Sequence, residues 1–206
     1  MHKEIASGSS GNCIIYHNSI AVDMGVNYKS IEGLKNSLQL ILLTHSHKDH
    51  FNIITIEKLA FERPSLRFGC GEFLAEKLVG IKNVDIYEAG KVYDYGSFSI
   101  SPIKLYHDVP NFGYRIFKNG TKILHATDTA HLECVEAKDY DLYALEANYD
   151  EDEAAIQIRE ASIKGEFCHK IGSINSHLSW QQANDFYFKN KGLNSKLIRL
   201  HESQTF

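Results

Sequence analysis

The sequence predicts an α/β protein in which two β-sheets pack face to face with helices on their outer sides. Short segments rich in β-branched and aromatic residues occur in both halves of the chain, and segments with helical spacing of apolar residues follow them. At 206 residues and 43% hydrophobic, the chain is long enough for one sizeable globular domain. We therefore expect a single domain spanning residues 1–206, built from two layers of strand and two of helix.

The N-terminal half is expected to begin with a meander that leads into a buried strand. Asn18-Ser19 and the glycine-rich segment SGSSGN supply the turns. The predicted strands cover residues 3–6, 12–18, 19–23 and 38–44. Residues 51–61 then show the apolar spacing of a helix that Pro64 ends, and a second helix over 71–80 closes at Gly80.

The C-terminal half again places strands before helices. The predicted strands cover residues 84–87, 97–106, 112–120, 121–127, 141–147 and 195–200. Asn119-Gly120 is a strong hairpin signal between two of them. Residues 151–162 are expected to be helical. Ser179 and Gln182 form a capping-box pattern that opens a further helix over 180–191, which Gly192 closes.

The charge of the chain argues against a general surface for binding polyanions. The net charge is -4, but its distribution is uneven. Residues 1–158 hold 15 basic and 22 acidic residues, a balance of -7, whereas residues 159–199 hold 7 basic and 3 acidic residues, a balance of +4. The C-terminal quarter could therefore attract phosphate, although a solvated helical surface explains the same pattern equally well.

Neither a membrane helix nor a disulfide framework is expected. The chain shows no N-terminal leader and no apolar run near the roughly 20 residues that span a bilayer, so we expect a cytoplasmic protein that makes no membrane contact. The cysteines show no CxxC spacing, and we expect reduced thiols that serve as small buried residues. They are Cys13, Cys70, Cys134 and Cys168.

The most informative stretch is THSHKDH at residues 44–50, directly after the apolar run LQLILL. In an extended chain, residues two apart point the same way, so His45 and His47 can present two imidazoles to one metal ion. Asp49 and His50 follow where the chain turns into a helix, and they can serve a second metal ion nearby. Imidazole and carboxylate together suit Zn, and also Mn or Fe.

This motif resembles the signature of the metallo-β-lactamase fold, a four-layer αββα sandwich with its metals at one edge of the two sheets. The resemblance implies further ligands after later strands, and His107, Asp128 and His201 each follow a predicted strand. It also implies a particular division of the ligands between two metals. His45, His47 and His107 would hold one metal, Asp49, His50 and His201 the other, and Asp128 would bridge them. Asp23 would orient the histidine loop.

Other segments indicate a branch of this family. ASGSSGNC, HDVPNFGYRIF, HATDT, LEANYD and SHLS together resemble the YycJ/WalJ group of exonucleases and, more distantly, phosphodiesterases of the RNase Z type. Asp128 stands where many true β-lactamases of this fold have cysteine, which points away from penicillin hydrolysis. The resemblance implies that His177 contacts phosphate or donates a proton and that Glu146 is its partner.

The implied activity is that of a binuclear metal-dependent phosphodiesterase, most specifically a DNA exonuclease. Two divalent ions, Zn or Mn, can lower the pKa of a bridging water and supply a hydroxide that attacks phosphorus. Asp49, His177 and Glu146 are the predicted catalytic residues, with His177 as the proton donor. The substrate partner would be a nucleic acid or nucleotide, and a homodimer is an assembly to be tested.

Three alternatives remain open at this point. A compact chain without nucleic-acid-gripping arms also suits a cyclic-nucleotide phosphodiesterase. A thioester or lactone hydrolase needs the same ligands but has no use for His177. A metal-stabilised binding or sensor protein would have lost turnover. Only 20 residues separate His107 from Asp128, which is too few for a long tRNA-gripping arm and argues against tRNA 3′ processing.

Overall fold

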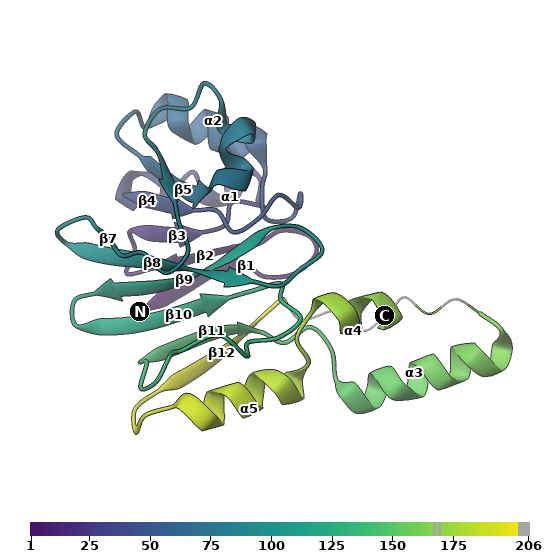
Figure 1. The fold of residues 1–206 in the computed structure, drawn as a ribbon. Coiled ribbons are helices and arrows are strands. Elements are labelled where there is room, and N and C mark those ends of the chain that lie inside the picture. Colours follow the sequence, from purple (N-terminus) through teal and green to yellow (C-terminus); the bar gives the residue numbers. More distant parts are fainter. Residues whose placement is uncertain (167, 169, 202–206) are drawn as a thin grey trace. The chain divides into compact units, whose positions relative to one another are not determined.

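The computed structural model describes residues 1–166, 168 and 170–201 (Figure 1). The chain divides into two compact units, an N-terminal unit, Met1–Val92, and a C-terminal unit, Tyr93–Phe206. Each unit holds one six-stranded sheet, with the strand order β1-β2-β3-β4-β5-β6 in the first and β12-β11-β10-β9-β8-β7 in the second. The assignment of residues 1–206 to a single domain stays a prediction.

The N-terminal unit confirms the expected meander. Its strands are β1 (His2–Ala6), β2 (Cys13–Tyr16), β3 (Ile20–Val22), β4 (Leu40–Leu42), β5 (Arg67–Gly71) and β6 (Val84–Tyr87). Strands β1 to β3 pair antiparallel, and β3 to β6 pair parallel. The helical segments are α1 (Tyr28–Ile31), η1 (Lys35–Ser37), α2 (Ile53–Glu62) and η2 (Glu72–Leu78).

Several elements of this unit differ from the expectation, and the short helical segments α1 and η1 were not predicted. The segment 71–80 forms the 3-10 helix η2 rather than an α-helix. Strand β5 was not expected, because it is short and contains Gly69 and Gly71, and glycine weakens a strand signal. The structure shows why Gly69 is there: a Cβ atom at this position would collide with the ring of Tyr87 on the neighbouring strand.

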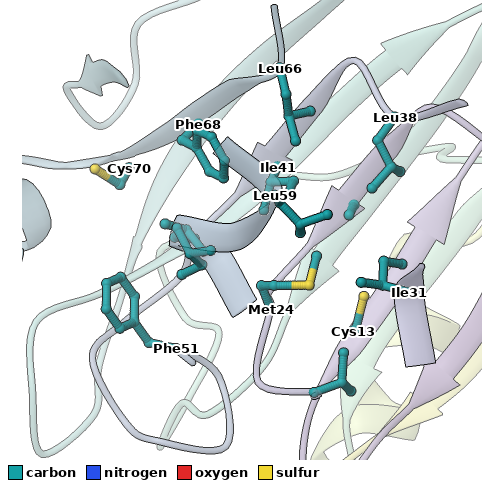
Figure 2. Packing of buried hydrophobic residues seen from close by; sticks show 14 of the residues in the cluster. Cys13, Met24, Ile31, Leu38, Ile41, Phe51, Leu59, Leu66, Phe68 and Cys70 are labelled. Carbon is teal, nitrogen blue, oxygen red and sulfur yellow. The ribbon is translucent and has the colours of Figure 1, made fainter. Parts of the chain in front are cut away.

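The core of the N-terminal unit lies between its sheet and its helices. Figure 2 shows Leu59 of α2 packed with Ile41 of β4 and Phe68 of β5, while Met24 and Phe51 come from the segments that follow β3 and the histidine motif. All of these side chains are less than one tenth exposed. Burial of each such side chain contributes roughly 1.5–3 kcal/mol. The histidine segment is therefore held between two ends that are fixed in the core.

The C-terminal unit begins with an antiparallel ladder and ends with parallel strands. Its strands are β7 (Tyr93–Asp94), β8 (Phe98–Leu105), β9 (Asn111–Lys118), β10 (Thr121–Ala126), β11 (Leu142–Glu146) and β12 (Lys196–Leu200). Strands β7 to β10 pair antiparallel, whereas β10, β11 and β12 pair parallel. Asn119 and Gly120 both have positive φ and form the tight turn of the β9–β10 hairpin, which confirms the hairpin prediction.

Among its described residues, the C-terminal unit also holds the helices α3 (Glu151–Lys164), α4 (Lys170–Ser176) and α5 (Trp180–Asn190). The Ser179–Gln182 capping box opens α5 as predicted. This helix lies along β11 and β12 (Figure 1), and Ala183 packs there with Tyr143 and Leu178 in the core of the unit. Nε1 of Trp180 also donates a hydrogen bond to the carbonyl of Ala147 at 2.7 Å. The chain that leads from α4 into α5 is thereby fixed beside the end of β11.

The cysteines confirm part of the expectation. All four are free thiols, and Cys13 and Cys70 are buried. The expected burial is wrong for Cys134, which is exposed, and Cys168 is partly exposed. Across the part of the chain that the structure describes, no helix combines the length and apolar character needed to cross a membrane.

Candidate metal centre

The histidine motif lies in the loop between β4 and α2 of the N-terminal unit. The hydroxyl of Thr44 donates to the carboxylate of Asp23 at 2.8 Å and lies 2.9 Å from Nδ1 of His45. Because that hydroxyl has one proton, Nδ1 of His45 is the donor in the second contact, and Nε2 keeps its lone pair. This Nε2 lies 3.1 Å from Nδ1 of His47. One nitrogen of each of these two imidazoles therefore lies close to the other.

The side chain of Asp23 holds this loop in place by hydrogen bonds. The residue is buried and has a φ of 62°, a left-handed conformation that Asp and Asn tolerate better than most residues. Its carboxylate accepts hydrogen bonds from the backbone N–H of Thr44 at 2.9 Å and from Nδ1 of His50 at 2.6 Å. The second bond leaves Nε2 of His50 with its lone pair, which is the usual arrangement of a metal-binding histidine and its supporting carboxylate.

Replacing Asp23 by asparagine is expected to lower the free energy of unfolding by about 2 kcal/mol, because one buried partner then loses a hydrogen bond to a charged acceptor. Urea denaturation of the metal-free protein measures this. Asp139→Asn is the matched control, since Asp139 also has a positive φ but is exposed. Equal midpoints for the two variants would contradict the anchoring role of Asp23.

Asn12 holds the second half of the motif, a role that the sequence did not indicate. Its side-chain Nδ2 lies 3.2 Å from Oδ2 of Asp49 and 2.9 Å from Nε2 of His50. Its Oδ1 accepts the backbone N–H of Gly8 at 2.8 Å, so the SGSSGN turn is built around this side chain. The only available signal was the position of Asn12 inside the ASGSSGNC segment.

Gly25 allows the backbone after β3 to approach the loop closely. A Cβ atom at Gly25 would collide with the backbone carbonyl of Asp49 and the nitrogen of His50. Gly25→Ala is therefore expected to lower the free energy of unfolding by about 2 kcal/mol through overpacking. At Gly33 a Cβ atom would meet nothing within 4 Å, so Gly33→Ala is the control. The prediction fails if thermal denaturation gives both variants the same melting temperature.

In the C-terminal unit, the predicted residues meet at the ends of parallel strands. Asp128 follows β10, Glu146 ends β11 and His201 follows β12. Because parallel neighbours end at the same edge of a sheet, the three side chains lie close together. Asp128 has a φ of 52°, and Nδ2 of Asn111 holds it there by donating to its backbone carbonyl at 2.7 Å.

His107 and His201 both direct Nε2 toward Asp128. The distances from Nε2 to Oδ2 of Asp128 are 3.8 Å for His107 and 3.9 Å for His201. Nδ1 of His107 donates to the carbonyl of Ser176 at 2.9 Å, and its Nε2 also lies 2.9 Å from Oδ1 of Asp108. Nδ1 of His201 lies 3.1 Å from the side chain of Asn148 and 3.6 Å from Glu146. Both imidazoles therefore point one nitrogen at a shared carboxylate oxygen.

Glu146 and His177 form a hydrogen-bonded pair beside these residues. Oε1 of Glu146 accepts from Nδ1 of His177, while Oε2 accepts from the backbone N–H groups of Thr129 and Leu178 at 2.8 and 3.2 Å. Burial lowers the pKa of His177, but the hydrogen bond and charge of Glu146 and the charge of Asp128 outweigh it, so the pKa is raised. His177 also stacks on His201, with ring centroids 5.5 Å apart.

The chemistry of these donors fits divalent metal ions. In the C-terminal unit, ligand atoms of Asp128, Glu146, His177 and His201 all lie within 4.8 Å of one another. Imidazole nitrogens and carboxylate oxygens suit Zn²⁺ and Mn²⁺. For His45 and His50, the supporting hydrogen bonds on Nδ1 leave the lone pair on Nε2, as metal binding requires.

Comparison with known proteins identifies the class. A family model described as a beta-lactamase superfamily domain matches residues 29–190. The fold and this match define a metal-dependent hydrolase. The chain belongs to the beta-lactamase superfamily. No curated protein matches it.

Several solved structures share the fold. The metallo-beta-lactamase fold protein YhfI from Bacillus subtilis is 17% identical with a TM-score of 0.74, and the match covers 100% of this chain and 86% of that one. Human tRNase Z, short form, is 15% identical with a TM-score of 0.68, covering 98% of this chain and 92% of that one. A diphosphatase from the PhnP family is 16% identical with a TM-score of 0.64, covering 98% and 85%. The predicted fold class, the metallo-β-lactamase sandwich, is confirmed.

Proposed function

We propose that the chain is a binuclear metal-dependent phosphodiesterase acting on nucleic acid, and specifically a DNA exonuclease. The observation that supports this most directly is the Glu146–His177 pair next to Asp128. A hydrolase of thioesters or lactones needs metal ligands but no imidazole held by a carboxylate beside them. Phosphodiester hydrolysis uses such an imidazole, because the leaving alkoxide needs a proton.

Seven residues are proposed as ligands of two divalent ions, Zn or Mn. They are His45, His47, Asp49, His50, His107, Asp128 and His201. Two such ions, when bound, activate water and stabilise charge on the phosphoryl oxygens. Asp128 is proposed to serve both ions, since Nε2 atoms of two histidines face its Oδ2. Asp49 is also proposed to be a catalytic residue, and its Oδ2 lies 3.5 Å from Nε2 of His50.

His177 is proposed to protonate the leaving oxygen. The raised pKa keeps a larger share of the imidazole protonated near neutral pH than an ordinary histidine would have. Glu146 fixes the ring by accepting from Nδ1, so Nε2 is the nitrogen that donates the proton. The two backbone N–H groups on Oε2 of Glu146 hold that carboxylate in place. Glu146 is therefore a positioning residue for His177.

Two relatives by fold support a phosphorus substrate, since one is a tRNase Z and another a diphosphatase. The hairpin between β9 and β10 is a tight turn rather than an arm that could grip a tRNA, so we favour a DNA strand over tRNA. We place the activity in the cytoplasm, where an exposed thiol such as Cys134 stays reduced. A homodimer is part of the proposal, and sedimentation of the purified protein tests it.

The test is a parallel turnover assay of chelator-stripped protein restored with Mn²⁺ or Zn²⁺. The substrates are end-labelled single-stranded and duplex DNA, RNA and a panel of cyclic nucleotides. Stepwise loss of the end label from DNA is expected. Turnover of cyclic nucleotides with nucleic acids untouched would replace the exonuclease with the alternative phosphodiesterase. Metal binding without turnover of any substrate would favour a sensor protein.

A further inference from the structure

A stacked pair of rings, of which Tyr106 is exposed and His131 partly exposed, lies next to the C-terminal cluster and has no role in the proposed chemistry. Tyr106 directly precedes His107, and its ring stacks on the imidazole of His131, three residues after Asp128. The ring centroids are 4.4 Å apart, and the planes differ by 24°. Because Tyr106 is 40% exposed, much of its ring can contact another molecule.

The backbone, rather than these rings, holds the two segments together. The N–H of Tyr106 donates to Oγ1 of Thr129 at 3.0 Å, and the N–H of Ala130 donates to the carbonyl of Tyr106 at 2.7 Å. Oγ1 of Thr129 in turn donates to the carbonyl of His131 at 3.0 Å. Within the described residues, Nδ1 of His131 has no hydrogen-bond partner. Removing the Tyr106 side chain should therefore leave the loop in place.

A positive charge accompanies the ring pair. Lys104 and Tyr106 are two residues apart at the end of β8, so their side chains leave the chain on the same side. Nζ of Lys104 lies 5.6 Å from the centroid of the Tyr106 ring. An exposed aromatic ring beside an ammonium group is the combination that binds single-stranded nucleic acid, with a base on the ring and a phosphate on the cation.

We propose that Tyr106, supported by His131, stacks on the nucleobase of a nucleotide flanking the scissile phosphate, and that Lys104 binds the adjoining phosphate. The inference rests on the proposed phosphodiesterase function and names a recognition site for its substrate. Neighbouring residues in an extended chain point in opposite directions, so Tyr106 can contact the base while His107 faces Asp128. Stacking tolerates any base, so this site recognises nucleotides without selecting a sequence.

The test compares oligonucleotides that carry a base, or an abasic sugar, at either nucleotide flanking the first scissile phosphate. With the wild-type protein, one of the abasic substrates is expected to show a KM about tenfold higher. Tyr106→Ala should raise the KM of the complete oligonucleotide by about tenfold and remove the difference between the substrates, with kcat within about twofold. Tyr106→Phe keeps the ring and should restore the difference. When 2-aminopurine replaces the base at the flanking nucleotide that matters for KM, the wild-type protein should quench its fluorescence and the Tyr106→Ala variant should not.

Phe188→Ala is the matched control. Phe188 on α5 is 64% exposed and has Nζ of Lys191 5.4 Å from its ring centroid, but it lies outside the cluster. The same loss of discrimination in Phe188→Ala would overturn the inference. So would an equal fall in kcat on both substrates in Tyr106→Ala, because that indicates a packing role. Either result would overturn the inference alone, because the wild-type protein would still cleave nucleic acid. If the wild-type protein cleaves no nucleic acid, the proposed function itself fails.

Discussion

Replacing Asp128 by asparagine is expected to reduce turnover to below about a thousandth of the wild-type rate and to lower the bound metal. An amide oxygen cannot supply the charge of a carboxylate that faces Nε2 of both His107 and His201. Asparagine tolerates the φ of 52° at this position, so the backbone should keep its conformation. Metal content by atomic emission and kcat on the best substrate measure the two effects.

The control for this variant is Asp139→Asn, which makes the same chemical change at another residue with positive φ in the same unit. Asp139 is exposed and outside the cluster, so this variant should keep the wild-type metal content and rate. Near-normal activity in Asp128→Asn would refute the ligand assignment. Circular dichroism of each variant separates a loss of metal from a loss of fold.

Replacing His177 by alanine is expected to lower kcat by about 10²- to 10³-fold on a natural phosphodiester, with the metal content retained. The loss should shrink to a few-fold on a p-nitrophenyl phosphodiester, because that leaving group departs without a proton. Glu146→Gln should follow the same pattern with a smaller loss, since glutamine can still accept from Nδ1 but carries no charge.

This dependence on the leaving group separates proton donation from a structural role. A His177→Ala variant that loses the same factor on both substrates would show that the ring positions substrate or metal instead. Unchanged turnover of the natural substrate would show that His177 has no part in the reaction. Lys189→Ala on the exposed side of α5 is a control for nonspecific effects of mutating this region.

Much of the candidate site was predictable because its residues follow strands. An apolar run and the turn signals beside it mark where a strand ends, and the order of parallel strands puts those ends at one edge. The family resemblance selected His107, Asp128, Glu146 and His201 from the sequence, and in the structure they lie within one unit at the ends of β8, β10, β11 and β12. Strand β5 was not predicted because its two glycines lower the strand propensity of the segment and are there to allow close packing.

The supporting hydrogen bonds could not be predicted. The side chain of Asn12 donates a hydrogen bond to Asp49, which is 37 residues away in the sequence. The carbonyl of Ser176 accepts a hydrogen bond from Nδ1 of His107, which is 69 residues away. Such bonds depend on how loops pack, and loop packing leaves no periodic pattern in a sequence. By contrast, the capping box at Ser179 and the turn at Asn119-Gly120 involve residues within a few positions of each other, and both predictions were confirmed.

By itself, the sequence determined the fold class and the residue types available for chemistry, because hydrophobic periodicity and local turn geometry act over short spans of chain. Only the tertiary structure decided that Nδ1 of His50 and Nδ1 of His107 donate to supporting acceptors, since those acceptors belong to Asp23 and Ser176. It also decided that Tyr106 meets His131 beside the cluster. Both depend on contacts between segments far apart in the chain, which form when the two units fold.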